Sequence, residues 1–122
     1  MKTEIINWLQ RLEKEVGAPP PEVIAFNFGL FESAKGYMIY IVGAFEYDEK
    51  DDDWACIELP QNPAAYLLFP NEMQSKSWEN ILDYSKNVLT ELEKESGFDK
   101  TILKNAIAIT TGFDEGELIK IR

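Results

Sequence analysis

The sequence predicts an α+β fold in which an antiparallel β-sheet is packed on one face by two main helices. Apolar residues recur every third or fourth position near the N-terminus and again over 75–96, which is the period of an amphipathic helix. An alternation with a period of two over 23–32 and 37–47 indicates strands. Each element then has one apolar face to bury, and the length suits a single domain, 1–122.

The first predicted helix begins at Thr3, a suitable N-cap residue, and ends at Gly17. Its apolar face carries Ile5, Trp8, Leu9, Leu12 and Val16. Three consecutive prolines at 19–21 stop the helix, because proline has no amide hydrogen and disfavours helix in the preceding residue.

Strands are predicted on both sides of a turn at 33–36. In the first, Ile24, Phe26, Phe28 and Leu30 form one apolar face, and the second, rich in β-branched and aromatic residues, is its antiparallel partner. Further strands are expected over 54–59, 66–69 and 107–110, the last paired with 117–121.

The second helix is capped by Ser75 or Ser77 and ends in a Schellman motif at Gly97 and Phe98. Its apolar face carries Trp78, Ile81, Leu82, Ser85, Val88, Leu89 and Leu92.

The composition excludes several classes of enzyme. The chain has no histidine and a single cysteine, Cys56, so it lacks histidine-activated nucleophiles and histidine-containing metal sites. Carboxylates near Cys56 would raise the pKa of its thiol, which predicts a small buried side chain and not a nucleophile. We therefore expect no catalytic residues, no cofactor and no bound metal.

The net charge restricts the partners. Twenty-two Asp and Glu against twelve Lys and Arg give a net charge of −10. This charge repels nucleic acids and anionic membranes, and it attracts basic protein surfaces. The N-terminal segment has no signal-peptide pattern, no apolar run is long enough for a membrane span, and the single cysteine does not imply an oxidising compartment. These features predict a cytoplasmic protein.

An acidic run before the third predicted strand is the main candidate for recognition. It contains Glu46, Asp48, Glu49, Asp51, Asp52 and Asp53, with Lys50 as its one basic residue. Three interpretations are open: a solvated hairpin loop, a loop that recognises a basic partner, and a calcium site. The run lacks the ligand spacing of an EF-hand loop, which counts against calcium.

Aromatic residues flank the acidic run. Trp54 is either a core residue or, if it is exposed, an aromatic anchor of an interface, and Tyr47 is a second candidate anchor. A second acidic segment contains Asp114 and Glu115 between two glycines; it is either an ordinary hairpin turn or part of the same binding surface. No phosphate-binding lysine motif accompanies these glycines.

The chain resembles immunity proteins of bacterial polymorphic toxin systems. The resemblance lies in the acidic α+β build, in the aspartates that precede Trp54, Ala55 and Cys56, in the helix that begins near Trp78, and in the ending AIAITTGFDEGEL at 106–118. It implies a protein that binds a cognate protein toxin and blocks its active site, often the basic cleft of a nuclease. The oligomeric state stays open.

Two other functions are compatible with the sequence. One is a non-catalytic adaptor or regulatory module of the cell interior with a peptide partner. Such a module would have the same composition and charge as an immunity protein. The other is a small hydrolase that uses two carboxylates, for example Glu58 and Asp114, as acid and base. Such an enzyme needs a pocket that desolvates one carboxylate, and no sequence feature indicates one.

Overall fold

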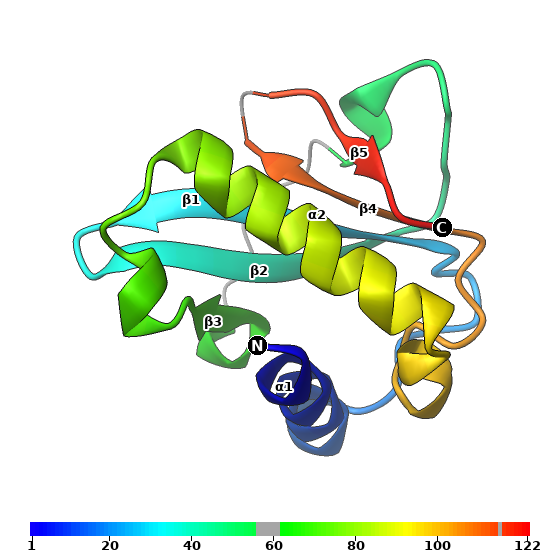
Figure 1. The fold of residues 1–122 in the computed structure, drawn as a ribbon. Helices are drawn as coiled ribbons and strands as arrows, with labels where there is room; N and C mark the ends of the chain where they lie inside the picture. The colour runs from blue at the N-terminus through cyan, green and yellow to red at the C-terminus, as the bar shows by residue number, and fades with distance from the viewer. Residues whose placement is uncertain (56–61, 115) are drawn as a thin grey trace.

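The computed structural model describes residues 1–55, 62–114 and 116–122. Figure 1 shows a five-stranded sheet with helices α1 and α2 on one face. In chain order the elements are α1 (Lys2–Val16), β1 (Ala25–Ser33), β2 (Gly36–Ala44), η1 (Asp52–Ala55), η2 (Pro63–Ala65), β3 (Tyr66–Leu68), η3 (Asn71–Met73), α2 (Trp78–Lys94), η4 (Gly97–Lys100), β4 (Ala108–Phe113) and β5 (Ile119–Lys120), where η denotes a 3-10 helix.

The strand order is β3-β2-β1-β4-β5, and the sheet is mostly antiparallel, which confirms the predicted α+β class. The hairpin of β1 and β2 pairs Ala25 with Ala44 at one end and Ser33 with Gly36 at the other. The short strand at 66–68 and the hairpin of β4 and β5 also follow the prediction. The prediction did not include the pairing of β1 with β4, which is parallel. The long connection through α2 makes this arrangement possible.

The main core lies between the sheet and the two helices. Trp8, Phe28 and Phe98 are fully buried there, and the ring centroid of Phe28 lies 6.2 Å from that of Trp8 and 6.1 Å from that of Phe98. The indole nitrogen of Trp8 donates a hydrogen bond to the carbonyl oxygen of Ala64 at 2.7 Å. The burial of Trp8 and Phe28 accounts for the predicted apolar faces of α1 and β1, and α2 adds Ile81, Val88, Leu89 and Leu92 to the same core.

On the opposite face, the neighbouring strands β1 and β4 carry small and short polar side chains. β1 is buried on both faces over residues 25–30, although its sequence predicted only one apolar face. Paired positions of β1 and β4 on this second face match in size: Ala25 with Ala108, Asn27 with Thr110, and Gly29 with Gly112. We call this surface the small-residue face. Because its side chains are short, loops and rings can lie directly on the strands.

Hydrogen bonds satisfy the polar groups buried in and around the sheet. The hydroxyl of Thr110 donates to Oδ1 of Asn27 at 2.9 Å, and the hydroxyls of Ser85 and Thr111 lie 3.0 Å apart. The second pair explains how α2 can place a serine on its apolar face. Among the described residues, no buried side-chain nitrogen or oxygen lacks a partner.

The arginine at position 122 ties β5 to α2. Its Nε and one terminal nitrogen bind the Glu93 carboxylate at 2.6 and 2.8 Å, and the pKa of Arg122 is raised mainly by this hydrogen bonding. Its other terminal nitrogen donates to the carbonyl oxygens of Leu103, Lys104 and Ala106. The turn that precedes β4 is therefore held in place by one side chain.

Two predicted helix ends differ from the structure. The N-cap of α1 is Met1, two residues before the predicted Thr3, so Thr3 lies within the first turn. At the end of α2 the left-handed residue is Ser96 (φ 58°), not Gly97, which starts η4. Gly97 lies against Leu92: a Cβ there would be 3.0 Å from the Leu92 side chain and 3.2 Å from its carbonyl oxygen. The glycine therefore serves close packing. The prediction for Ser77 as N-cap of α2 is confirmed, since its hydroxyl accepts from the amide of Asn80.

The predicted strand at 54–59 is wrong at its start, because Trp54 and Ala55 belong to the 3-10 helix η1. The remainder, with Cys56 and Glu58, lies outside the described residues. Two members of the predicted apolar helix faces, Val16 and Trp78, are exposed. No helix in the described part of the chain combines the length and apolarity needed to cross a bilayer.

The close packing on the small-residue face predicts that a larger residue at Gly29 destabilises the protein. A Cβ at this position would overlap the ring of Tyr40. That ring cannot move freely, because it contacts Phe31 and Tyr66 and its hydroxyl donates to the Asp114 carboxylate. We expect Gly29→Ala to lower the free energy of unfolding by about 1–3 kcal/mol in urea titrations.

Gly116→Ala is the matched control, because no atom lies closer than 3.7 Å to a Cβ there, and it should change stability by less than about 0.5 kcal/mol. The cost of Gly29→Ala should shrink in a Tyr40→Ala background, where the ring is absent. Equal costs in the two backgrounds would show that the ring does not lie on Gly29.

Candidate functional site

The acidic loop, residues 45–55, leaves the sheet at the end of β2 and returns over the small-residue face. Trp54 is 6% exposed and packs with Ala25, Ala44 and Ala108 in a core cluster separate from the main one. The ring of Tyr47 meets the ring of Trp54 edge to face, with centroids 5.2 Å apart. Trp54 is thus the buried base of the loop, and Tyr47, half-buried, is the more accessible of the two predicted anchors.

The carboxylates of the loop point outward above this base. Glu46, Asp48, Glu49 and Asp51 are all exposed. Asp48 also shapes the loop, because its Oδ1 accepts from the backbone amide of Lys50 at 2.9 Å. This local bond is typical of aspartate in turns.

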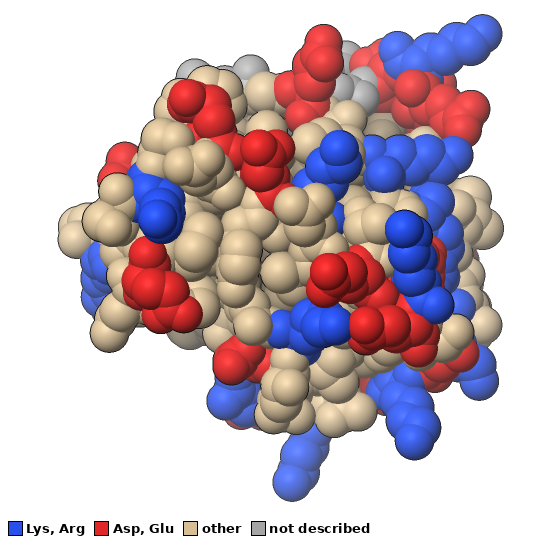
Figure 2. Space-filling view, in the orientation of Figure 1, with Lys and Arg blue, Asp and Glu red and all other residues tan. Residues whose placement is uncertain are grey.

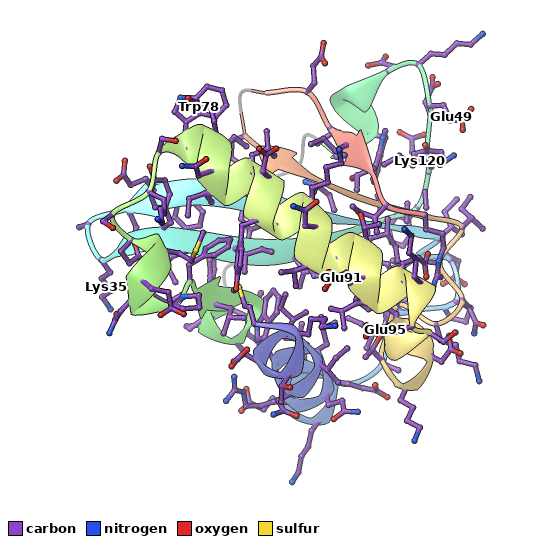
Figure 3. The ribbon with its side chains drawn as sticks, in the orientation of Figure 1. Lys35, Glu49, Trp78, Glu91, Glu95 and Lys120 are labelled. Carbon is purple, nitrogen blue, oxygen red and sulfur yellow. The ribbon has the colours of Figure 1, made fainter. Side chains whose placement is uncertain are left out.

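Lys120 of β5 ties the acidic loop to the edge of the sheet. Its ammonium lies 2.7 Å from the Glu49 carboxylate, and the two side chains point toward one another in Figure 3. The hydrogen bond from Lys120, and then its charge, lower the pKa of Glu49; the same contacts raise the pKa of Lys120. The ion pair therefore stabilises the fold between these two pKa values. Its contribution falls as pH drops through the lowered pKa of Glu49 or rises through the raised pKa of Lys120.

A second acidic segment, the 114–118 turn, lies on the same side of the sheet. Asp114 and Glu117 are exposed, and the next residue, Leu118, packs against the Trp54 cluster. A hollow of about 390 Å³ separates the loop from β5 and is lined by Tyr47, Asp48, Glu49, Lys50, Trp54, Thr110, Leu118 and Lys120. Figure 1 places both segments along its top, and at the upper right of Figure 2, where Figure 1 draws the loop, acidic side chains lie beside basic ones.

We call this surface the acidic edge. It comprises the exposed carboxylates of the loop and of the turn: Glu46, Asp48, Glu49, Asp51, Asp114 and Glu117. The structure thus places on one side of the sheet two acidic segments that lie far apart in the sequence, with Leu118 of the second packed against the Trp54 cluster. Asp114 also has a structural role, since its carboxylate accepts a hydrogen bond from Tyr40.

Several predicted site residues lie outside what the structure describes. Asp52 and Asp53 belong to η1 by their backbone, but their side chains are outside the described part, as are Glu115 and the proposed hydrolytic Glu58. Among the described residues, no group of three or more Asp, Glu, His or Cys side chains is placed to hold a metal ion.

The sequence analysis missed two residues of this region. Lys120 gave no local signal, because its partner is 71 positions away in the chain. Phe45 was taken as part of a strand ending at residue 47, but β2 ends at Ala44 and Phe45 is 69% exposed. The charged residues that follow Phe45 mark the point where the chain leaves the sheet.

The arrangement suits recognition of a positively charged surface. Exposed carboxylates on a packed aromatic base provide charge and shape. Comparison of the chain with protein-family models, with curated proteins and with solved structures finds no match.

The ion pair of Lys120 with Glu49 can be tested by nuclear magnetic resonance, through the pKa of the Glu49 carboxylate. Lys120→Met should raise the pKa of the Glu49 carboxylate toward its ordinary value, because the substitution removes the hydrogen bond and the charge that lower it. The measurement is a side-chain carboxyl titration of both proteins.

The control variant is Lys35→Met, which removes a lysine from the distant turn between β1 and β2, labelled in Figure 3. This change should leave the Glu49 titration as it is in the unsubstituted protein. An ordinary pKa for Glu49 in the unsubstituted protein would contradict the ion pair.

Proposed function

We propose that the protein is a non-catalytic inhibitor that acts in the cytoplasm by binding a cognate bacterial toxin through the acidic edge. The observation that carries the proposal is the packing of two separate acidic segments onto one side of the sheet, joined by Leu118 and by the pair of Lys120 with Glu49. A basic active-site cleft on the toxin is the complementary surface.

Electrostatics favours such a partner. The run from Glu46 to Asp53 contains six carboxylates and Lys50, and Lys120 adds one positive charge, so the local net charge is 2 − 6 = −4. This local charge has the same sign as the net charge of −10 of the whole chain, so both attract a basic partner. A surface of this kind attracts a basic partner before contact and accelerates association.

Packing supports the proposal because it prepares the loop for binding. Trp54 is anchored on three alanines, Asp48 closes a turn on the amide of Lys50, and Lys120 binds Glu49. A loop that is already ordered loses less conformational entropy when it binds. The carboxylates are therefore presented at low entropic cost.

The toxin is the partner that the resemblance implies. The ending at 112–118, GFDEGEL, contributes Asp114 and Glu117 to the acidic edge, so the segment that carries the resemblance lies in the surface we propose for binding. An inhibitor of this kind works by occupying the active site and needs no catalytic residue of its own.

The identity of the partner can be tested in two steps. The immobilised protein is exposed to extract from its native host, and retained proteins are identified by mass spectrometry. The gene of a retained basic protein is then expressed with and without this chain. We expect growth arrest without the chain and growth with it. A retained protein that is harmless to cells would contradict the inhibitor proposal.

Removal of charge from the loop should slow association. In the variant with Glu46→Gln, Asp48→Asn and Asp51→Asn, three negative charges are lost, and the amide oxygen of the asparagine introduced at position 48 can still accept from the Lys50 amide. We expect association with the identified partner to slow by about tenfold at 0.1 M salt. At 1 M salt the Debye length falls to about 3 Å, so the two association rates should converge.

The matched control is Glu13→Gln with Glu15→Gln and Glu72→Gln, which removes the same charge from the end of α1 and from η3. These residues are exposed and lie away from the acidic edge, because α1 and η3 pack on the opposite face of the sheet. The control should slow association much less. Equal slowing by both variants would mean that total charge matters and that the acidic edge is not the contact surface.

A further inference from the structure

An apolar patch lies at the end of the sheet from which the acidic loop departs. Phe45 follows the last residue of β2 and is 69% exposed, and Ile107 precedes β4 and is 60% exposed. Ile24, half-buried, lies between their strands: its carbonyl oxygen accepts from the amide of Ile107 at 2.8 Å, and its amide donates to Ala44 at 2.9 Å. We call Phe45, Ile24 and Ile107 the apolar end patch.

The exposure of Phe45 is notable because its neighbours turn inward. Ala44 is buried beneath Trp54, and Tyr47 packs on the same ring, so the chain on either side of Phe45 contributes to a core. Single exposed apolar side chains are normal on protein surfaces. Two strongly exposed ones on adjoining segments, beside a half-buried isoleucine, form a patch that can bind a partner.

Charge defines the occupant of this patch. The acidic loop begins its run of carboxylates at Glu46, directly after Phe45, and Asp48 and Asp51 follow within the same loop. Protein interfaces commonly have an apolar centre with aromatic residues and a polar or charged rim. Phe45 joins the apolar end patch to the acidic loop, because it stands between the last residue of β2 and the first carboxylate of the loop.

We infer that the apolar end patch is the anchor of the interface with the toxin, and that its occupant is a Lys/Arg-rich protein surface with apolar residues at its centre. The inference rests on the proposed function and adds to it the residues that hold the complex together. The carboxylates accelerate association, whereas Phe45 and Ile107 slow dissociation.

A second copy of this chain is a poor occupant. Each copy carries a net charge of −10 and would bring its own acidic loop against that of the other. Like charges placed together disfavour such a contact. A nucleic acid is disfavoured for the same reason.

The test compares Phe45→Ala and Ile107→Ala with Leu68→Ala, which removes an exposed apolar side chain (42%) from β3, the strand at the edge of the sheet opposite β5. All three side chains are exposed, so the melting temperatures should stay within about 3 °C of the unsubstituted protein. We expect dissociation from the retained basic partner to accelerate by about thirtyfold for Phe45→Ala, the effect of losing one interface hot spot, and to stay unchanged for Leu68→Ala. Association rates should change little.

A photo-crosslinking amino acid at position 45, with the same residue at position 68 as control, provides a second measurement in host cells. Crosslinking of the basic partner from position 45 alone, together with faster dissociation of Phe45→Ala, supports the inference. If the partner is retained but dissociates at an unchanged rate from Phe45→Ala and is not crosslinked from position 45, the apolar end patch is not the anchor of the interface. The proposal that the acidic edge binds the partner is not affected by this result. Crosslinking of two copies of this chain would also overturn it. If the unsubstituted protein retains no basic partner, the proposed function fails and the anchor fails with it.

Discussion

The structure depends on the burial of β1 from both sides. One face of this central strand meets the helices through Phe26, Phe28 and Leu30, and the other must be covered without a second layer of helices. The small-residue face solves this problem, because short side chains on β1 and β4 let the acidic loop and the ring of Tyr40 lie directly on the strands. The position of the acidic edge is a consequence of this packing.

Local pattern was sufficient to predict most of the fold. Period-two alternation identified the hairpin of β1 and β2, and helical periodicity identified α1 and α2, because one-sided burial leaves these patterns in the sequence. The parallel pairing of β1 with β4 could not be predicted in this way. Its signal is a match in size between residues 83 positions apart, such as Ala25 and Ala108, and each residue taken alone is unremarkable.

The candidate site was predictable in charge but not in geometry. A run of carboxylates is visible in any sequence, so the exposure of Glu46, Asp48 and Asp51 follows from composition. Trp54 was predicted in a strand because aromatic residues favour strands. In the structure it belongs to the 3-10 helix η1, and this conformation also buries its ring against three alanines. The pairing of Lys120 with Glu49 depends on tertiary structure alone, since it joins β5 to a loop from the middle of the chain.

The central claim is that the acidic loop is held against the sheet by Trp54. The most direct test is a nuclear Overhauser measurement on protein with labelled alanine methyl groups. The account predicts cross-peaks from the Trp54 ring to the methyls of Ala25, Ala44 and Ala108, which belong to three neighbouring strands. A Trp54 ring that shows no cross-peak to these methyls would contradict the account, because the acidic edge would then have no fixed base.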